Sequence, residues 1–272
     1  MSATSNIADV AVVIPVFNSG ADALGAIRSV QAQTVPVREI VVVDDGSTDG
    51  SAAAIAAAVE DGNPPVRIVR IPNGGAASAR NAGIRQTSTQ YLAFLDSDDR
   101  WLPDKLARQL SILDTRPEVG LVGTRTTMKS TLVDRRIDAL GPEMRITARA
   151  QLFKNFFQTS TVLVRRSVLD AVGLFPAGQR YAEEGDLFLR IAAHSPCILL
   201  NEALVDYAGG KGGFGVAGLS SNIWRMERGE LANIHRAWRR ADCTLPVYLL
   251  ATVFSLLKFM RRVLLRHLPA NA

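Results

Sequence analysis

The first hundred residues alternate short apolar runs with segments of helical periodicity, and this alternation limits the possible folds more than any other feature. The strand candidates are 10–16, 39–43, 66–71 and 91–95, and a further one follows at 160–164. The helix candidates are 21–32, 49–59 and 76–85. Continuous apolar runs are typical of strands that are covered on both faces. The pattern therefore predicts an α/β fold with a doubly wound, mostly parallel sheet.

Composition narrows the class of protein. The chain has 272 residues, 47% of them hydrophobic and 21% charged, which is typical of a globular protein with one large or two small domains. Its two cysteines, Cys197 and Cys243, have no zinc-finger spacing, so we expect neither a disulfide framework nor a structural zinc, and a reducing cytoplasm fits. Residues 1–9 lack the features of a secretory signal.

The positive charge is concentrated near the end of the chain. The formal net charge is +5, and from Arg225 onward nine Lys and Arg stand against three Asp and Glu. This indicates a basic tail on a neutral body, and it argues against a nucleic-acid-binding surface.

Acidic residues follow the strand candidate 91–95 at once, at Asp96, Asp98 and Asp99. If the strand continues, Asp96 and Asp98 point to the same side and can share one divalent cation. Carboxylates favour Mg²⁺ and Mn²⁺ alike, so the ligands do not separate the two. The alternative is an acidic turn before a helix that Pro103 opens.

Two further polar segments follow strand candidates. Asp44 comes after four apolar residues, where a carboxylate needs a partner such as the imide N–H of a uracil ring. Capping of the next helix explains Ser47, Thr48 or Asp49 without a ligand. In the segment 73–81, glycines permit a close helix approach and Arg80 supplies a cation or stacking group, although an ordinary surface arginine is the alternative. The segment is neither a P-loop nor a dinucleotide fingerprint.

Four motifs in this order resemble family 2 glycosyltransferases of the GT-A fold: VIPVFN at 13–18, VDDGSTD at 43–49, NGG with ARN at 73–81, and FLDSDD at 94–99. The resemblance covers about residues 10–190. It implies a DxD metal motif at Asp96 and Asp98, with Asp99 as a possible further ligand. It also implies a donor site in which Arg80 assists the base or phosphate. The other donor-site residues that it implies are Pro15, Phe17, Asn18, Asp44 and Asp45.

Sugar transfer also needs a base for the acceptor hydroxyl, and the segment EEGDL at 183–187 offers one. Family members usually carry Glu-Asp-x-Asp-Leu here, so Glu184 replaces the aspartate and keeps a carboxylate that accepts a proton. Glu184 is the predicted base and Glu183 the second candidate, with inversion at the anomeric carbon. An acidic first helical turn favoured by the helix dipole is the alternative.

The glycine-rich segment 209–215 suits a lid over the donor, from which Lys211 would reach the diphosphate; a plain flexible loop is the alternative. The family often has a metal-contacting histidine nearby, and this chain has none between His194 and His235. The Gln-x-x-Arg-Trp signature of processive synthases is also absent, which favours the addition of a single sugar.

The apolar run 245–257 is shorter than the roughly 20 residues that span a bilayer. After it, Lys258, Arg261, Arg262 and Arg266 recur at helical spacing and predict one basic face. We expect peripheral contact of 245–268 with anionic lipid at the cytoplasmic face of the membrane. The alternative is a helix packed on its own domain or on a second subunit.

The expected organisation is a GT-A domain at 1–219 and a helical region at 220–272. The expected function is metal-dependent transfer of one sugar from a UDP- or dTDP-linked donor to a glycan or lipid-linked acceptor of the cell envelope or an exopolysaccharide. An inactive membrane-peripheral scaffold on the same fold is the competing hypothesis, and a nucleotidyltransferase is a weaker third. No nucleic acid partner is expected, and an oligomer is possible.

Overall fold

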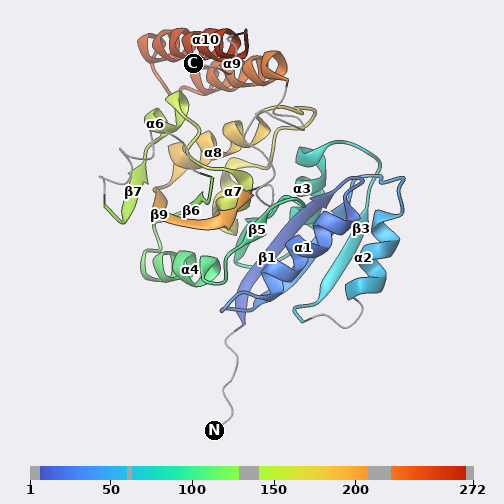
Figure 1. The fold of residues 1–272 in the computed structure, drawn as a ribbon. Helices are drawn as coiled ribbons and strands as arrows, with labels where there is room; N and C mark the ends of the chain where they lie inside the picture. Colours follow the sequence, from blue (N-terminus) through green and yellow to red (C-terminus); the bar gives the residue numbers. More distant parts are fainter. Residues whose placement is uncertain (1–6, 60–62, 129–140, 208–221, 268–272) are drawn as a thin grey trace.

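The described residues form one mixed sheet with helices on both of its faces (Figure 1). The structure is a computed structural model, and it describes residues 7–59, 63–128, 141–207 and 222–267. The strands are β1 (Ala8–Val16), β2 (Val37–Asp44), β3 (Val66–Arg70), β4 (Tyr91–Phe94), β5 (Arg100–Trp101), β6 (Leu121–Thr126), β7 (Glu143–Ile146), β8 (Leu163–Arg165) and β9 (Cys197–Asp206).

The helices follow the predicted rhythm in the first half of the chain and become more frequent in the second half. They are α1 (Gly20–Gln31), α2 (Ser51–Val59), α3 (Ala76–Arg85), α4 (Lys105–Thr115), α6 (Ala148–Phe153), α7 (Arg166–Val172), α8 (Glu183–His194), α9 (Ile223–Arg239) and α10 (Leu245–His267), with a 3-10 turn, η1, at Thr159–Thr161.

The strand order is β3-β2-β1-β4-β8-β6-β9-β5, with β7 paired to β9. The first four strands of this order are parallel, as the sequence predicts, whereas β8 joins β4 and β6 in antiparallel pairs. Side chains of β1 alternate between two cores: Val12 and Ile14 pack on one face, and Ala11 and Val13 on the other. Burial on both faces explains the continuous apolar runs of the sequence.

The prediction of a strand at 160–164 is only partly right. Leu163 begins β8, but Ser160 lies in η1, where the N–H of Thr161 donates to the carbonyl oxygen of Gln158 at 2.9 Å. The hydroxyl of Thr161 donates to the same oxygen at 2.7 Å, which favours the turn over extended backbone.

The C-terminal helices α9 and α10 lie side by side at the end of the molecule away from the N-terminus, with α6 and α8 beneath them (Figure 1). Asn222 caps α9 by accepting from the N–H of Arg225 at 3.1 Å. No helix within the described ranges is long and apolar enough to cross a membrane.

The predicted basic face of α10 is wrong in two of its four members. Lys258 Nζ donates to the carbonyl oxygen of Phe153 at 3.0 Å, and Arg262 Nη2 lies 2.7 Å from Glu227 Oε2, so both cations point into the protein. Both contact carboxylates of α9: Arg262 pairs with the buried Glu227, whose charge would be costly without a partner, and Lys258 lies 3.7 Å from the partly exposed Glu230. Arg261 is exposed as expected, and the side chain of Arg266 lies outside the described residues.

Candidate active site

Asp44 ends β2 and is almost completely buried, at 1% exposure. Its Oδ1 accepts from the N–H of Ser47 at 2.9 Å, which closes the turn after the strand. Its Oδ2 is buried, has no hydrogen-bond partner among the described residues, and lies 3.4 Å from Nε of Arg70. This oxygen therefore has acceptor capacity that no hydrogen bond among the described residues uses. The cation is supplied by Arg70 at the end of β3, a residue that the sequence-based prediction did not include.

The other predicted donor residues divide into two groups. Phe17 is 50% exposed and Pro15 is partly buried, so the Phe17 ring is open to a planar group. Asn18 instead joins two loops, because its N–H donates to Ser47 Oγ at 3.0 Å and its Oδ1 accepts from the N–H of Thr48 at 2.9 Å.

Asp45 holds the glycine turn that precedes α3. Its two carboxylate oxygens accept from the N–H groups of Gly74 and Gly75, each at 2.8 Å. Gly75 has φ 86°, a left-handed conformation that favours glycine. The carboxylate of Asp45 therefore fixes the glycine turn, and both of its oxygens accept from backbone N–H groups.

The acidic cluster lies in a turn and not on a strand. The strand β4 ends at Phe94, and the N–H of Asp99 donates to the carbonyl oxygen of Asp96 at 3.0 Å. Asp96 and Asp98 therefore do not alternate along a strand, and our prediction that strand geometry points them to the same side is wrong. Asp99 is buried at 2% exposure, whereas Asp98 remains accessible. Desolvation, and next the charge of Asp96, raise the pKa of Asp98.

Ser160 supports this turn from η1, which the sequence did not indicate. Its Oγ accepts from the N–H of Asp96 at 3.0 Å, and its carbonyl oxygen accepts from Trp101 Nε1 at 2.8 Å. The indole is itself buried, with Lys105 Nζ 3.8 Å from its ring centroid. The backbone at Asp96 is thus held by a packed network.

Arg80 connects the acidic turn to α8, and it is not the surface residue that we considered as an alternative. It is 4% exposed, with Nη2 2.6 Å from Asp96 Oδ1 and Nη1 2.9 Å from Glu183 Oε1. Burial lowers the pKa of Arg80, but the charges of Asp96 and Glu183 outweigh it and raise the pKa overall. The guanidinium fork suits this double pairing.

Glu184 lies next to this ion pair in the first turn of α8. Desolvation, and then the charge of Glu183, raise its pKa to about 7. Its Oε1 accepts from Asn155 Nδ2 at 3.3 Å, and Gln151 Nε2 donates to Asn155 Oδ1 at 2.6 Å. A carboxylate with a pKa near neutrality accepts and releases protons readily, as a general base must.

Tyr207, just after β9, links the acidic turn with the predicted base. Burial raises its pKa to about 12, and the charges of Asp99, Asp96, Asp98 and Glu184 add to the effect. The turn and Glu184 therefore act on one phenol. The ion pairs of Arg80 bring the acidic turn that follows β4 next to the start of α8, at the carboxyl end of the parallel strands.

The backbone that leads into α8 is strained. Ala182 has φ 55°, a left-handed conformation that costs a non-glycine residue about 1–2 kcal/mol. The α9 helix braces it: Asn233 Nδ2 donates to the carbonyl oxygen of Ala182 at 2.7 Å, and a Cβ on Gly229 would meet the carbonyl oxygen of Tyr181 at 2.4 Å.

Asp186 completes this contact between α8 and α9. It is 3% exposed and pairs with Arg190 at 2.9 Å, Arg236 at 3.0 Å and Arg240 at 3.0 Å. Burial alone would raise its pKa, but these arginines lower it overall. The third acidic residue of the EEGDL segment is therefore a structural anchor.

The carboxylates of the acidic turn fit a divalent metal site only in part. Asp96 and Asp98 are hard oxygen donors whose mutual repulsion a cation would relieve, and Mg²⁺ often takes one or two carboxylates plus substrate phosphates. Among the described residues, no group of three or more His, Cys, Asp and Glu side chains is arranged to hold an ion. A three-carboxylate site that includes Asp99 is therefore not formed there.

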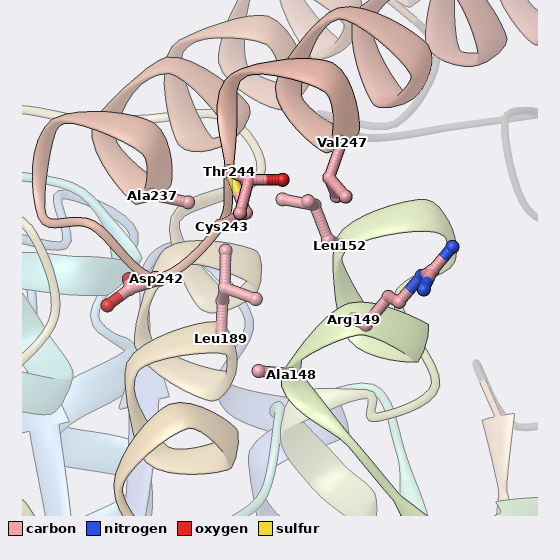
Figure 2. Close-up of a pocket in the computed structure, with 9 residues that line it drawn as sticks. All are labelled: Ala148, Arg149, Leu152, Leu189, Ala237, Asp242, Cys243, Thr244 and Val247. Carbon is pink, nitrogen blue, oxygen red and sulfur yellow. The ribbon is translucent and has the colours of Figure 1, made fainter.

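A separate pocket lies between α6, α8, α9 and the start of α10, away from these carboxylates (Figure 2). Its volume is about 200 Å³, and Leu152, Leu189 and Val247 project into it from three helices. Its lining includes none of the predicted site residues. The predicted lid 209–215 and Lys211 lie outside the described residues.

Comparison with known proteins identifies the family. Residues 11–173 match the model of Glycosyl transferase family 2. An uncharacterized glycosyltransferase of Nostoc sp. is 33% identical over 171 residues, which cover 60% of this chain and 52% of the relative, so the chain spans about half the length of that protein. The putative teichuronic acid biosynthesis glycosyltransferase TuaG of Bacillus subtilis is 38% identical over 108 residues, which cover 39% of this chain and 42% of TuaG.

Solved structures agree on the fold. The mannosyltransferase PcManGT of Pyrobaculum calidifontis, in complex with GDP-Man and Mn²⁺, has a TM-score of 0.70 at 20% identity and covers 92% of this chain and 73% of its own. TarS 1–349 of S. aureus in complex with UDP-GlcNAc has a TM-score of 0.65 at 18% identity, and the match covers 91% of this chain and 71% of the TarS chain. With a family model over more than half of its length and this shared α/β fold, the chain belongs to glycosyltransferase family 2.

Proposed function

We propose that the protein transfers a single sugar from a nucleotide-sugar donor to an acceptor hydroxyl, with inversion at the anomeric carbon. The observation that carries this proposal is the junction at Arg80, which joins Asp96 of the acidic turn to Glu183 beside the predicted base. A donor diphosphate at Asp96 would thereby lie close to a carboxylate, Glu184, whose pKa is about 7. Such a pairing suits sugar transfer better than a binding scaffold.

The donor proposed is a UDP- or dTDP-linked sugar. Uracil and thymine carry an imide N–H, which the buried Oδ2 of Asp44 would accept, and the exposed ring of Phe17 would contact the base. The complexes of TarS with UDP-GlcNAc and of PcManGT with GDP-Man support a nucleotide-sugar donor in general.

In the proposed reaction the acceptor hydroxyl attacks the anomeric carbon from the side opposite the diphosphate. Glu184 takes the hydroxyl proton, a new carbon–oxygen bond forms, and the bond to the diphosphate oxygen breaks with its electron pair on the leaving group. Asp96 and Asp98 would hold Mn²⁺ or Mg²⁺, which when bound supplies Lewis-acid stabilisation of the departing diphosphate. Asn155 orients the base by donating to Glu184.

The acceptor proposed is a glycan or lipid-linked molecule of the cell envelope or an exopolysaccharide, met by the enzyme at the cytoplasmic face of the membrane. The putative role of TuaG in teichuronic acid biosynthesis supports an envelope acceptor. We retain the division into a transferase domain at 1–219 and a helical region at 220–272.

A panel of nucleotide sugars tests the proposal through the release of nucleoside diphosphate with and without Mn²⁺ or Mg²⁺. Metal-dependent release from one donor, lost in Glu184→Gln and accelerated by an acceptor, is the expected result. The same variant should bind the donor as tightly as the unmodified protein. Tight donor binding without release under any condition would support the scaffold instead.

A further inference from the structure

One side of α10 is apolar and exposed. The helix packs on α9 through Ala251, Ser255 and Phe259, each at most 8% exposed. Its other side presents apolar side chains that are each at least 41% exposed, which we call the apolar face: Leu245, Leu249, Leu250, Val253, Phe254, Leu256, Leu257, Met260, Leu264 and Leu265. An apolar surface of this extent marks a contact with a partner or a membrane.

The neighbouring helix α9 exposes positive charge. Arg225, Arg228, His235 and Arg239 are exposed and recur at helical spacing, so they line one side of α9, which we call the arginine stripe. Other sides of the helix are occupied, because Asn233 faces α8 and Glu227 pairs with Arg262 of α10. Arg225 Nη1 donates to the Tyr181 hydroxyl at 3.2 Å without being buried.

Trp224 joins the two surfaces. It is 69% exposed, and its ring lies 4.7 Å from that of Phe259 on α10. Tryptophan is enriched where a protein meets the boundary between headgroups and acyl chains, because its ring is apolar and its N–H is polar. The two helices therefore carry the three kinds of side chain that an interfacial surface uses.

We infer that the α9–α10 pair is a docking surface for an anionic lipid bilayer, in which the apolar face of α10 enters the acyl boundary and the arginine stripe of α9 contacts lipid phosphates. Packed helices lie roughly 8–10 Å apart, and an interfacial helix sinks roughly 5–10 Å below the headgroups. When α10 is submerged, α9 thus lies at the depth of the phosphates. This inference deepens the peripheral location in the proposed function and rests on it.

A bilayer fits better than a second copy of the chain. Two copies joined through the apolar face would bury Arg261 and bring their arginine stripes toward each other, whereas anionic lipid neutralises both. The cations that our sequence analysis assigned to headgroups, Lys258 and Arg262, already pair with Glu230 and Glu227. Apart from Arg261, the headgroup contacts are therefore made by α9.

Flotation of the full chain with vesicles tests this inference. One set of vesicles is pure phosphatidylcholine and the other contains equal parts phosphatidylcholine and phosphatidylglycerol. The variant Arg228→Gln/Arg239→Gln should bind the anionic vesicles roughly twenty-five-fold more weakly, since each arginine near an anionic surface contributes roughly five-fold. The matched control, Arg38→Gln/Arg85→Gln, removes the same charge from exposed positions outside α9 and should bind normally.

A second variant tests the apolar face. Leu249→Gln/Leu257→Gln/Met260→Gln should lose binding to both kinds of vesicle while keeping its melting temperature and its donor affinity, because these side chains are exposed. Equal flotation of the stripe variant and its control would overturn the inference, as would normal flotation of the triple variant. A lipid-free dimer that this triple variant dissociates would overturn it in favour of a second copy. Donor binding in every variant keeps these outcomes separate from failure of the transferase proposal.

Discussion

Substitution of Arg80 offers the sharpest test of the electrostatics in the candidate active site. Its guanidinium is 5% exposed and pairs with Glu183, which is 8% exposed, and with Asp96, which is 34% exposed. Removal of one partner from a buried pair costs about 3–5 kcal/mol, and the more exposed pair adds about 0–1 kcal/mol. Arg80→Met should therefore lower the free energy of unfolding by about 3–6 kcal/mol.

Urea unfolding of both proteins measures this loss. The transition midpoint of Arg80→Met should shift to a lower urea concentration while the slope stays the same.

A double-mutant cycle isolates the buried pair. Glu183→Gln in the Arg80→Met background should recover part of the loss, with a coupling energy of about 0.5–3 kcal/mol. Arg80→Lys keeps the positive charge but loses the planar guanidinium, so its free energy of unfolding should lie between those of the unmodified protein and Arg80→Met. A deficit below about 1 kcal/mol would refute the assignment of Arg80 as the cation that stabilises Glu183.

Four further predictions concern the proposed reaction. Glu184→Gln should lower the transfer rate by about 10²–10⁴-fold at unchanged donor affinity; unchanged turnover would contradict its role. Since the base must be deprotonated and the pKa of Glu184 is about 7, kcat/KM should fall as the pH drops below 7, and a flat profile to pH 5 would exclude it. Asp44→Asn should weaken UDP binding by about 10–100-fold in calorimetry, with Asp49→Asn as control. Gly229→Ala, whose Cβ would meet the Tyr181 carbonyl oxygen at 2.4 Å, should cost about 1–3 kcal/mol and lower kcat more than it changes the donor KM; wild-type stability would contradict the close contact.

The parallel half of the sheet was predictable because its signals are local. The runs that became β1, β2 and β4 are largely buried on both faces, so each reads as an apolar segment bounded by turn residues. Asp44 was recognisable for the same reason, as a carboxylate at the end of such a run. The strands β5 to β9 pair out of sequence order, and their register depends on contacts between distant segments that periodicity does not encode.

The arrangement of the site was less predictable than its residue types. Arg80 and Glu183 are separated by 103 positions, and only the fold brings them together. The contacts of Asn155 with Glu184 and of Ser160 with Asp96 are equally nonlocal. Lys258 contacts Glu230 of α9 and the carbonyl oxygen of Phe153 in α6, and a helical wheel of α10 alone does not show either contact.

The start of α8 bears on the choice between the enzyme and the scaffold. A carboxylate in the first turn of a helix gains about 0.3–1 kcal/mol from the dipole, and it gains this as an anion. At Glu184 the surroundings instead favour the protonated form, because desolvation and the adjacent Glu183 raise its pKa to about 7. The left-handed Ala182 before it costs about 1–2 kcal/mol more. An acidic helix start that served stability alone would place its carboxylates in water on relaxed backbone. The observed strain and desolvation therefore favour a carboxylate adapted to exchange a proton, which the acceptor hydroxyl would supply.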